Sequence, residues 1–201
     1  MIDQRLKKLI TPDSLHKAFC KHAYVFHTDG KINLFGIRNN DYSVGTFNDV
    51  LGIHYVENEQ DVLILHQGSV DPGSYYMNHP MQSSGTAVIR FQQVIDGWAP
   101  GYHMGYKALV QVKPAWFFRI TTEQFEKDGR IIRLSDKTPV FEQIGCNMHR
   151  VNSKFDVFNN TNASAGCQVR NLVDEYNKFI ELTWIVNAKY DYTVFPEKDF
   201  I

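Results

Sequence analysis

The chain has 201 residues, 43% hydrophobic and 13% aromatic, which is enough for one well-buried core but short for two ordinary domains. Its 21 Lys and Arg residues nearly balance 22 Asp and Glu residues and are scattered along the chain, which argues against nucleic acid as a partner. No segment approaches the roughly 20 consecutive apolar residues that a membrane helix needs. We therefore expect a single domain over residues 1–201 with no membrane span.

The N-terminal segment, residues 1–23, is expected to be helical. Thr11-Pro12-Asp13 is typical of a helix start, with an N-cap, a proline at the first helical position and an acidic first turn. Residues Met1 to Lys8 lack the apolar run and cleavage site of a signal peptide, so we expect a protein that is cytoplasmic on synthesis.

From about residue 24 to residue 139 the pattern is β-rich, because short apolar segments alternate with turns built of Gly, Pro, Asn and Asp. An Asp-Gly pair in Lys127–Arg130 predicts a hairpin turn between two paired strands. The expected strands are Ile32–Ile37, Asp49–Val56, Val62–His66, Thr86–Phe91, Ala108–Val112 and Ala115–Ile120.

The C-terminal part combines a helix and a strand. Apolar residues recur at three- and four-residue intervals from Val169 to Ile180, which predicts a helix directly after Cys167. Tyr190 to Phe195 reads as a final strand. The sequence therefore predicts a mainly β, α+β domain with short helices at its start and after Cys167.

Cys167 is the most promising candidate for chemistry, because it lies at a turn of small residues, Ser164-Ala165-Gly166. A thiol just before a helix would be near unpaired backbone N–H groups, which favour the thiolate and can also stabilise a developing oxyanion. His149, upstream in Cys146-Asn147-Met148-His149-Arg150, is the nearest candidate for a base. The other two cysteines, Cys20 and Cys146, are interpreted as structural.

These residues resemble the L,D-transpeptidase catalytic domain, whose pattern is a histidine followed by Ser-His-Gly-Cys-x-Arg. The matching positions are His149, Ser164, Gly166 and Cys167, and the eighteen residues from His149 to Cys167 are similar to the family spacing. The resemblance implies Cys167 as nucleophile, His149 as base and the N–H groups near Gly166 and Cys167 as oxyanion donors. Ser164 would shape the turn.

The chain differs from the family pattern at three places. Ala165 replaces the second histidine, Arg150 replaces the glycine that often follows the first, and Arg170 lies one position later than the family arginine. The rest of the chain, from Ile32 to Phe179, is similar to uncharacterised phage-encoded proteins that end in a Ser-Ala-Gly-Cys-Gln motif. In that setting the resemblance implies an endolysin-like enzyme that acts on the cell wall of the host.

The function that we expect is therefore a cysteine peptidase that hydrolyses peptidoglycan stem peptides or cross-links through a thioester, without a cofactor. Arg150 and Arg170 would bind substrate carboxylates, and Tyr102 and His103, in an expected glycine-flexed loop, would contact the substrate. The alternatives are an L,D-transpeptidase or carboxypeptidase, or an inactive phage structural or binding protein. A zinc site remains a weaker alternative, with candidate ligands His54, His66, Asp71, His79, His103 and His149.

Overall fold

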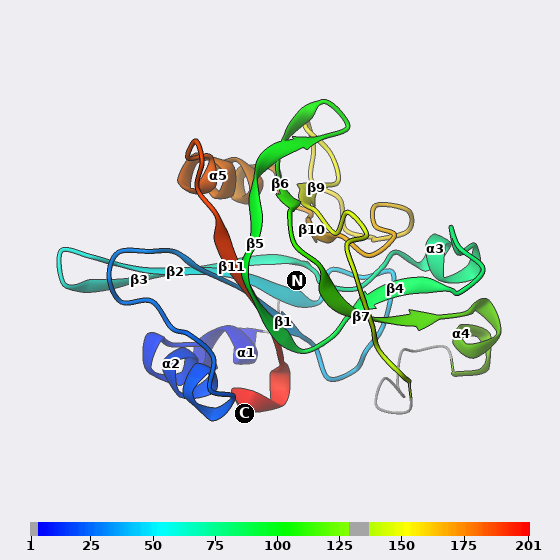
Figure 1. Ribbon diagram of the computed structural model, residues 1–201, viewed down its shortest axis with the longest axis horizontal. Coiled ribbons are helices and arrows are strands. Elements are labelled where there is room, and N and C mark those ends of the chain that lie inside the picture. Colours follow the sequence, from blue (N-terminus) through cyan, green and yellow to red (C-terminus); the bar gives the residue numbers. More distant parts are fainter. Residues whose placement is uncertain (1–3, 129–136) are drawn as a thin grey trace.

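The computed structural model describes residues 4–128 and 137–201 and is mainly β, with an eight-stranded sheet, a three-stranded sheet and short helices (Figure 1). The strands are Asn33–Arg38 (β1), Asp49–Glu57 (β2), Gln60–Ser69 (β3), Thr86–Ile89 (β4), Gln92–His103 (β5), Tyr106–Gln111 (β6), Ala115–Ile120 (β7), Val140–Glu142 (β8), Met148–Arg150 (β9), Gln168–Arg170 (β10) and Tyr190–Pro196 (β11). The helices are Gln4–Leu9 (α1), Pro12–Lys21 (α2), Ser74–Asn78 (α3), Thr122–Asp128 (α4) and Val173–Thr183 (α5), with a short 3-10 turn at Glu197–Asp199. The expected mainly β fold class is confirmed.

The large sheet closes on itself in the order β1-β11-β5-β6-β9-β10-β3-β2, since β2 pairs in turn with β1. Two of its pairings are parallel, β1 with β11 and β9 with β10, and the others are antiparallel. The small sheet, β4-β7-β8, lies to one side with α3 and α4 (Figure 1). The parallel β9–β10 pair is the feature that matters for the candidate site.

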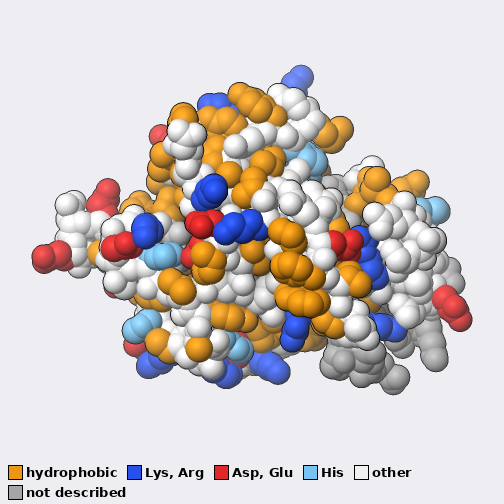
Figure 2. Space-filling model, in the orientation of Figure 1, with side chains coloured by type: hydrophobic (Ala, Val, Ile, Leu, Met, Phe, Trp, Pro, Cys, Tyr) orange, Lys and Arg blue, Asp and Glu red, His pale blue; other side chains and the backbone are white. Residues whose placement is uncertain are grey.

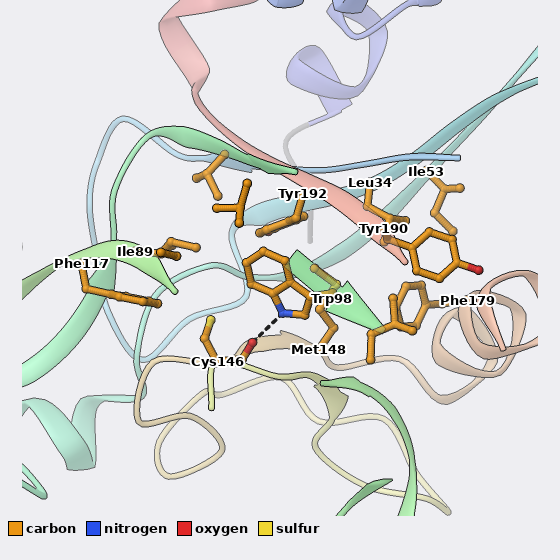
Figure 3. Close-up of a cluster of buried hydrophobic side chains, with 14 of the residues drawn as sticks. Leu34, Ile53, Ile89, Trp98, Phe117, Cys146, Met148, Phe179, Tyr190 and Tyr192 are labelled. Atoms are coloured by element: carbon orange, nitrogen blue, oxygen red, sulfur yellow. Dashed lines mark hydrogen bonds between the residues drawn. The ribbon is translucent and has the colours of Figure 1, made fainter. Parts of the chain in front are cut away.

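The principal core lies inside the closed sheet and continues to the small sheet and α5. Trp98 is its largest fully buried side chain, and its indole N–H donates to the carbonyl of Cys146 at 2.6 Å (Figure 3). Met148 of β9 and Phe179 of α5 belong to the same cluster. The chain between Cys146 and Met148 is thus fixed to the core directly beside the candidate site.

The N-terminal helical segment agrees with the sequence in the residues that the structure describes. Thr11 caps α2, and its side chain and that of Ser14 exchange hydrogen bonds with each other's backbone N–H groups. The apolar side chains of α1 and α2 pack against one side of β1 and β11 and form a second core cluster. None of the helices that the structure describes has the length and apolar character of a membrane-spanning segment.

The expected strands are present with small shifts, but the long strand β5 (Gln92–His103) was missed. Asp96-Gly97 and Pro100-Gly101 are typical of turns, whereas here Asp96, with φ of 52°, accompanies a bulge in the pairing of β5 with β11. The prediction that Tyr102 and His103 lie in a glycine-flexed loop is wrong, because both residues lie at the end of β5. Only Met104 and Gly105 form the turn, both with positive φ, as a two-residue hairpin requires.

The helix expected directly after Cys167 begins later than predicted. Gln168–Arg170 forms β10, which pairs with β9 on one edge and β3 on the other, and α5 starts only at Val173. Cys167 is therefore not at a helix N-terminus, and α5 provides no dipole at its sulfur. The expected hairpin turn at Lys127–Arg130 lies partly outside the described residues, and Lys127 and Asp128 end α4 rather than a strand.

Candidate active site

The two segments singled out in the sequence lie side by side. In the parallel β9–β10 ladder Val169 is opposite His149, and the Gln168 N–H donates to the Asn147 carbonyl at 2.9 Å. Because side chains alternate along a strand, positions two residues apart face the same way. The register therefore brings Cys167, two residues before Val169, to the same region as His149.

Ser164 and Gly166 form the turn that precedes Cys167. The Ser164 hydroxyl accepts from the Gly166 N–H at 3.0 Å and donates to the Cys167 carbonyl at 2.8 Å. Gly166 has φ of +133°, and a Cβ there would lie 2.9 Å from the Ala87 carbonyl oxygen. Only glycine fits this position without strain.

The oxyanion role expected for Gly166 is not compatible with this turn, because its N–H is already bonded to Ser164. Within the described residues, the Cys167 N–H donates no hydrogen bond, so it remains the candidate donor. The Gly166 N–H, one of the two expected oxyanion donors, is thus occupied by the Ser164 hydroxyl.

The Cys167 thiol lies close to the backbone of residues 145–147. Its sulfur is 3.5 Å from the Gly145 carbonyl oxygen, to which the thiol donates. Burial raises the pKa of Cys167 to about 11, and a hydrogen bond from the Asn147 N–H opposes this rise. The residue as a whole is nevertheless partly exposed at the surface.

His149 is 4% exposed, and hydrogen bonding at its Nδ1 atom orients the ring. Nδ1 lies 2.9 Å from the Arg150 carbonyl oxygen, and a carbonyl can only accept, so Nδ1 carries the proton. The Tyr106 hydroxyl is 3.3 Å from the same nitrogen. This arrangement leaves the lone pair on Nε2, the nitrogen that a general base uses.

Burial lowers the pKa of His149 to about 4, with His103 adding to the decrease and the Arg150 carbonyl opposing it. The imidazole is thus neutral at pH 7. Among the described residues, no hydrogen bond joins Cys167 and His149. The two groups form a neutral thiol and imidazole in one region, not a preformed ion pair.

His103 and Asn147 extend the site. The His103 ring stacks on His149, with 4.1 Å between centroids and 13° between planes. The Asn147 side-chain nitrogen lies 3.1 Å from His103 Nδ1, while the Asn147 backbone faces Cys167. Sequence reasoning placed His103 in a substrate-binding loop and missed Asn147, whose only signal was its position between Cys146 and His149.

Arg150 and Tyr106 also lie beside His149, and the Tyr106 ring packs edge-on against His103, with 5.6 Å between ring centroids. The Arg150 guanidinium carbon is 4.4 Å from the centroid of the Tyr106 ring and 5.5 Å from that of Tyr176. Tyr106 also donates to the Arg150 carbonyl. Tyr106 and Tyr176 had no distinguishing signal in the sequence, because aromatic residues are common in strands and helices.

Two of the expected substrate-binding residues are elsewhere. Arg170 is 2% exposed, donates through Nε to His66 Nδ1 at 3.1 Å and covers the Phe179 ring, so it is not accessible to a substrate. Tyr102 is exposed next to His103 on β5 and packs edge-on against Trp184. In the described residues, Tyr102 forms no hydrogen bond with His149 or Cys167.

The zinc alternative finds no support in the described residues, where no three His, Cys, Asp or Glu side chains are grouped as metal ligands. The candidate histidines have separate surroundings: His54 contacts Asn33 and Asp61, His66 contacts Arg170, and His79 stacks on Tyr75. Asp71 pairs with Arg38 in the interior.

No protein-family model, curated protein or solved structure matches this chain. The family resemblance read from His149, Ser164, Gly166 and Cys167 therefore remains a prediction. Support for the chemistry of the site comes from the geometry of the described residues. The β9–β10 register aligns the segment that carries a thiol and one backbone donor with the segment that carries an imidazole with a free lone pair, and these are groups that acyl transfer through a thioester uses.

Proposed function

We propose that this chain is a cysteine peptidase that cleaves peptidoglycan stem peptides or their cross-links, with Cys167 as nucleophile and His149 as general base. The observation that carries the proposal is the β9–β10 register, which aligns the two segments while the Arg150 carbonyl fixes the His149 tautomer. The chemical class, acyl transfer, rests on this geometry. The substrate class rests on the resemblance of the motif.

The proposed reaction starts from the neutral pair. At pH 7 a thiol with a pKa of about 11 is almost entirely protonated, so attack on the substrate carbonyl is coupled to transfer of the thiol proton to His149 Nε2. The Cys167 N–H then donates to the oxyanion. Collapse of the intermediate breaks the peptide bond, and the imidazolium returns the proton to the departing amine.

The resulting thioester is hydrolysed by water, with His149 again accepting a proton. Stacking of His103 on His149 fixes the plane of the imidazole, and Asn147 links His103 to the backbone beside Cys167. In this proposal His103 and Asn147 are positioning residues, because their contacts act through His149 and Cys167.

The proposal is tested by digesting purified peptidoglycan and identifying the released fragments by mass. Wild type, Cys167→Ala and His149→Ala are compared with Cys20→Ala and His79→Ala, whose side chains lie on the exposed parts of α2 and beside α3. We expect fragments from wild type and both control variants, and none from Cys167→Ala. Equal digestion by Cys167→Ala would exclude the proposed nucleophile, and an intact polymer in every sample would exclude the substrate.

A second candidate function is a phage structural or binding protein that has lost catalysis. The observation in its favour is that Cys167 and His149 share no hydrogen bond and are both neutral, with pKa values of about 11 and about 4. Binding to peptidoglycan without release of fragments, unchanged in Cys167→Ala, is the result that this candidate predicts. An L,D-transpeptidase would instead transfer the acyl group to an added amine, which the same mass analysis detects.

A further inference from the structure

A shallow pocket of about 360 Å³ lies next to the candidate active site, between β6, β9 and α5. It is lined by Lys107, Arg150, Tyr176, Asn177, Ile180 and Glu181. It adjoins the base through Arg150, because the Arg150 carbonyl accepts from His149 Nδ1 and its guanidinium side chain lines the pocket. The pocket therefore lies beside the backbone that orients His149, and Cys167 is not among the residues that line it.

The cationic side chains of Lys107 and Arg150 lie against aromatic rings. Arg150 lies over Tyr106 and near Tyr176, and the Lys107 ammonium is 5.0 Å from the ring centroid of Trp184. Within the described residues, neither Arg150 nor Lys107 forms an ion pair with a carboxylate. Glu181 is the one acidic residue of the lining, so the pocket has an excess of one positive charge.

A stacked guanidinium loses little conformational freedom when it forms a bidentate pair with a carboxylate. Tyr176 and Ile180 add an apolar wall that suits the carbon chain next to such a group. The positive excess and the stacking favour an anion over an ammonium or a neutral amide. The nearby His149 favours an anion that is part of the substrate.

We propose that Lys107 and Arg150 form a subsite for a free carboxylate of the peptide substrate, so that peptides with amidated carboxylates are bound and cleaved poorly. This inference rests on the proposed function for its substrate class. Lys107 had no signal in the sequence, and the pocket exists only because β6 and α5 lie beside Arg150.

The test uses one synthetic stem tetrapeptide in two forms, with all carboxylates free and with all carboxylates amidated. Calorimetry measures the binding of both forms to Cys167→Ala and to the double variants Cys167→Ala/Arg150→Gln, Cys167→Ala/Lys107→Gln and Cys167→Ala/Lys178→Gln. Lys178 is the matched control, because it is an exposed lysine of α5 that does not line the pocket. Thermal unfolding midpoints confirm that each variant is folded.

We expect the free acid to bind Cys167→Ala at least about tenfold more tightly than the amidated form, as for one charge-assisted pair. In the double variants, Arg150→Gln should make the affinities for the two forms equal, Lys107→Gln should reduce the difference between them and Lys178→Gln should leave the difference unchanged. Equal affinities for the two forms, or no detectable binding of either, would overturn the subsite.

Cleavage by wild type separates the two proposals. If wild type cleaves both forms at equal rates, the subsite is wrong and the peptidase stands. If Cys167→Ala prefers the free acid but wild type cleaves neither form, the subsite stands and the peptidase is wrong.

Discussion

At the scale of single residues, burial determines the protonation of the two central groups. Loss of solvent raises the pKa of the Cys167 thiol to about 11 and lowers the pKa of the His149 imidazole to about 4. Both groups are neutral over a wide range around pH 7. In the proposed reaction, proton transfer from Cys167 to His149 therefore accompanies nucleophilic attack, and a free thiolate is not the resting state.

The reactivity of the thiol tests this account. In a Cys20→Ser variant, which removes the exposed cysteine, alkylation by iodoacetamide should be slow at pH 7 and should keep rising up to pH 10. The reason is that the reactive thiolate becomes abundant only near the pKa of the buried thiol. Rates are measured by mass spectrometry of the peptide that contains Cys167. A plateau near neutral pH would show an activated thiolate and would contradict the neutral pair.

Gly166 provides a second test at this scale. Gly166→Ala should destabilise the fold by about 1–3 kcal/mol, because φ of +133° is strained for alanine and the Cβ meets the Ala87 carbonyl. Gly105→Ala is the matched control, since Gly105 also has positive φ but a Cβ there meets nothing within 4 Å. Urea unfolding measures both variants. An equal or larger cost at Gly105 would show that the close contact at Gly166 is not important.

At the scale of elements, the turn before β10 depends on the Ser164 hydroxyl. Ser164 is 1% exposed and bonds to both the Gly166 N–H and the Cys167 carbonyl, so its loss leaves two buried groups without partners. The Ser164 side chain therefore helps to position Cys167, together with the backbone hydrogen bond from Gln168 to Asn147.

Ser164→Ala should destabilise the protein by about 1–3 kcal/mol and should increase hydrogen exchange at the Gly166 amide. The control is Ser153→Ala, in an exposed part of the loop between β9 and β10. Amide exchange followed by NMR reports on the turn itself. Unchanged protection of Gly166 in Ser164→Ala would show that the turn is fixed by other contacts.

The sequence predicted most of the elements, and the errors have physical causes. Strands with strong apolar patterns and the capped helix α2 were correct, because local preferences and burial favour the same conformation there. β5 was missed because Asp96-Gly97 and Pro100-Gly101 are typical of turns, although such pairs also occur at bulges and on twisted strands. The start of α5 was misplaced because Val169 continues the helical spacing, whereas pairing with both β9 and β3 makes it part of a strand.

At the scale of the whole molecule, charged and hydrophobic side chains are mixed on the surface, and Figure 2 shows no extended region of one charge on the face that it presents. The interior, in contrast, holds several titratable groups. His66 is 2% exposed, and burial together with the Arg170 charge lowers its pKa to about 3. Asp49 has the opposite shift, because burial and the nearby Asp71 raise its pKa to about 8.

These shifts predict an acid-sensitive contribution to stability. A histidine whose pKa is lower in the folded state than the usual value of about 6.5 stabilises the fold above pH 6.5 and loses this contribution as the pH falls. Asp49 has the opposite effect on stability. Its carboxyl group takes up a proton in the folded state already below about pH 8, whereas the unfolded chain takes it up only near about pH 4, so the fold gains stability from Asp49 as the pH falls. The pH dependence of wild-type stability therefore combines opposing contributions. The contribution of His66 is obtained as the difference in unfolding free energy between wild type and a variant that lacks this histidine.

The difference is measured by urea unfolding of wild type and His66→Gln at pH 7 and pH 5. The excess stability of wild type over His66→Gln should decrease by about 2 kcal/mol between the two values, since only wild type must bind a proton at position 66 on unfolding. A constant difference would show that His66 is not buried as a neutral imidazole.

The candidate site was predictable only in part, because its residues come from distant segments. The motif with Cys167 and His149 was visible in the sequence, and the parallel β9–β10 pairing brings the two segments together. The contributions of Tyr106, Lys107 and Tyr176 depend on β6 and α5 packing beside β9, which no local pattern reveals. The same packing explains why Arg170, close to Cys167 in sequence, is buried against Phe179.

The proposed thioester between Cys167 and the substrate is detected by intact-mass spectrometry. Wild type is mixed with the free-acid stem tetrapeptide and quenched in acid at early times, and the modified residue is then located by peptide mapping. The thioester mechanism predicts an added acyl mass on Cys167 in wild type and no adduct in Cys167→Ala. Cleavage of the peptide by Cys167→Ala at the wild-type rate, without any adduct, would contradict it.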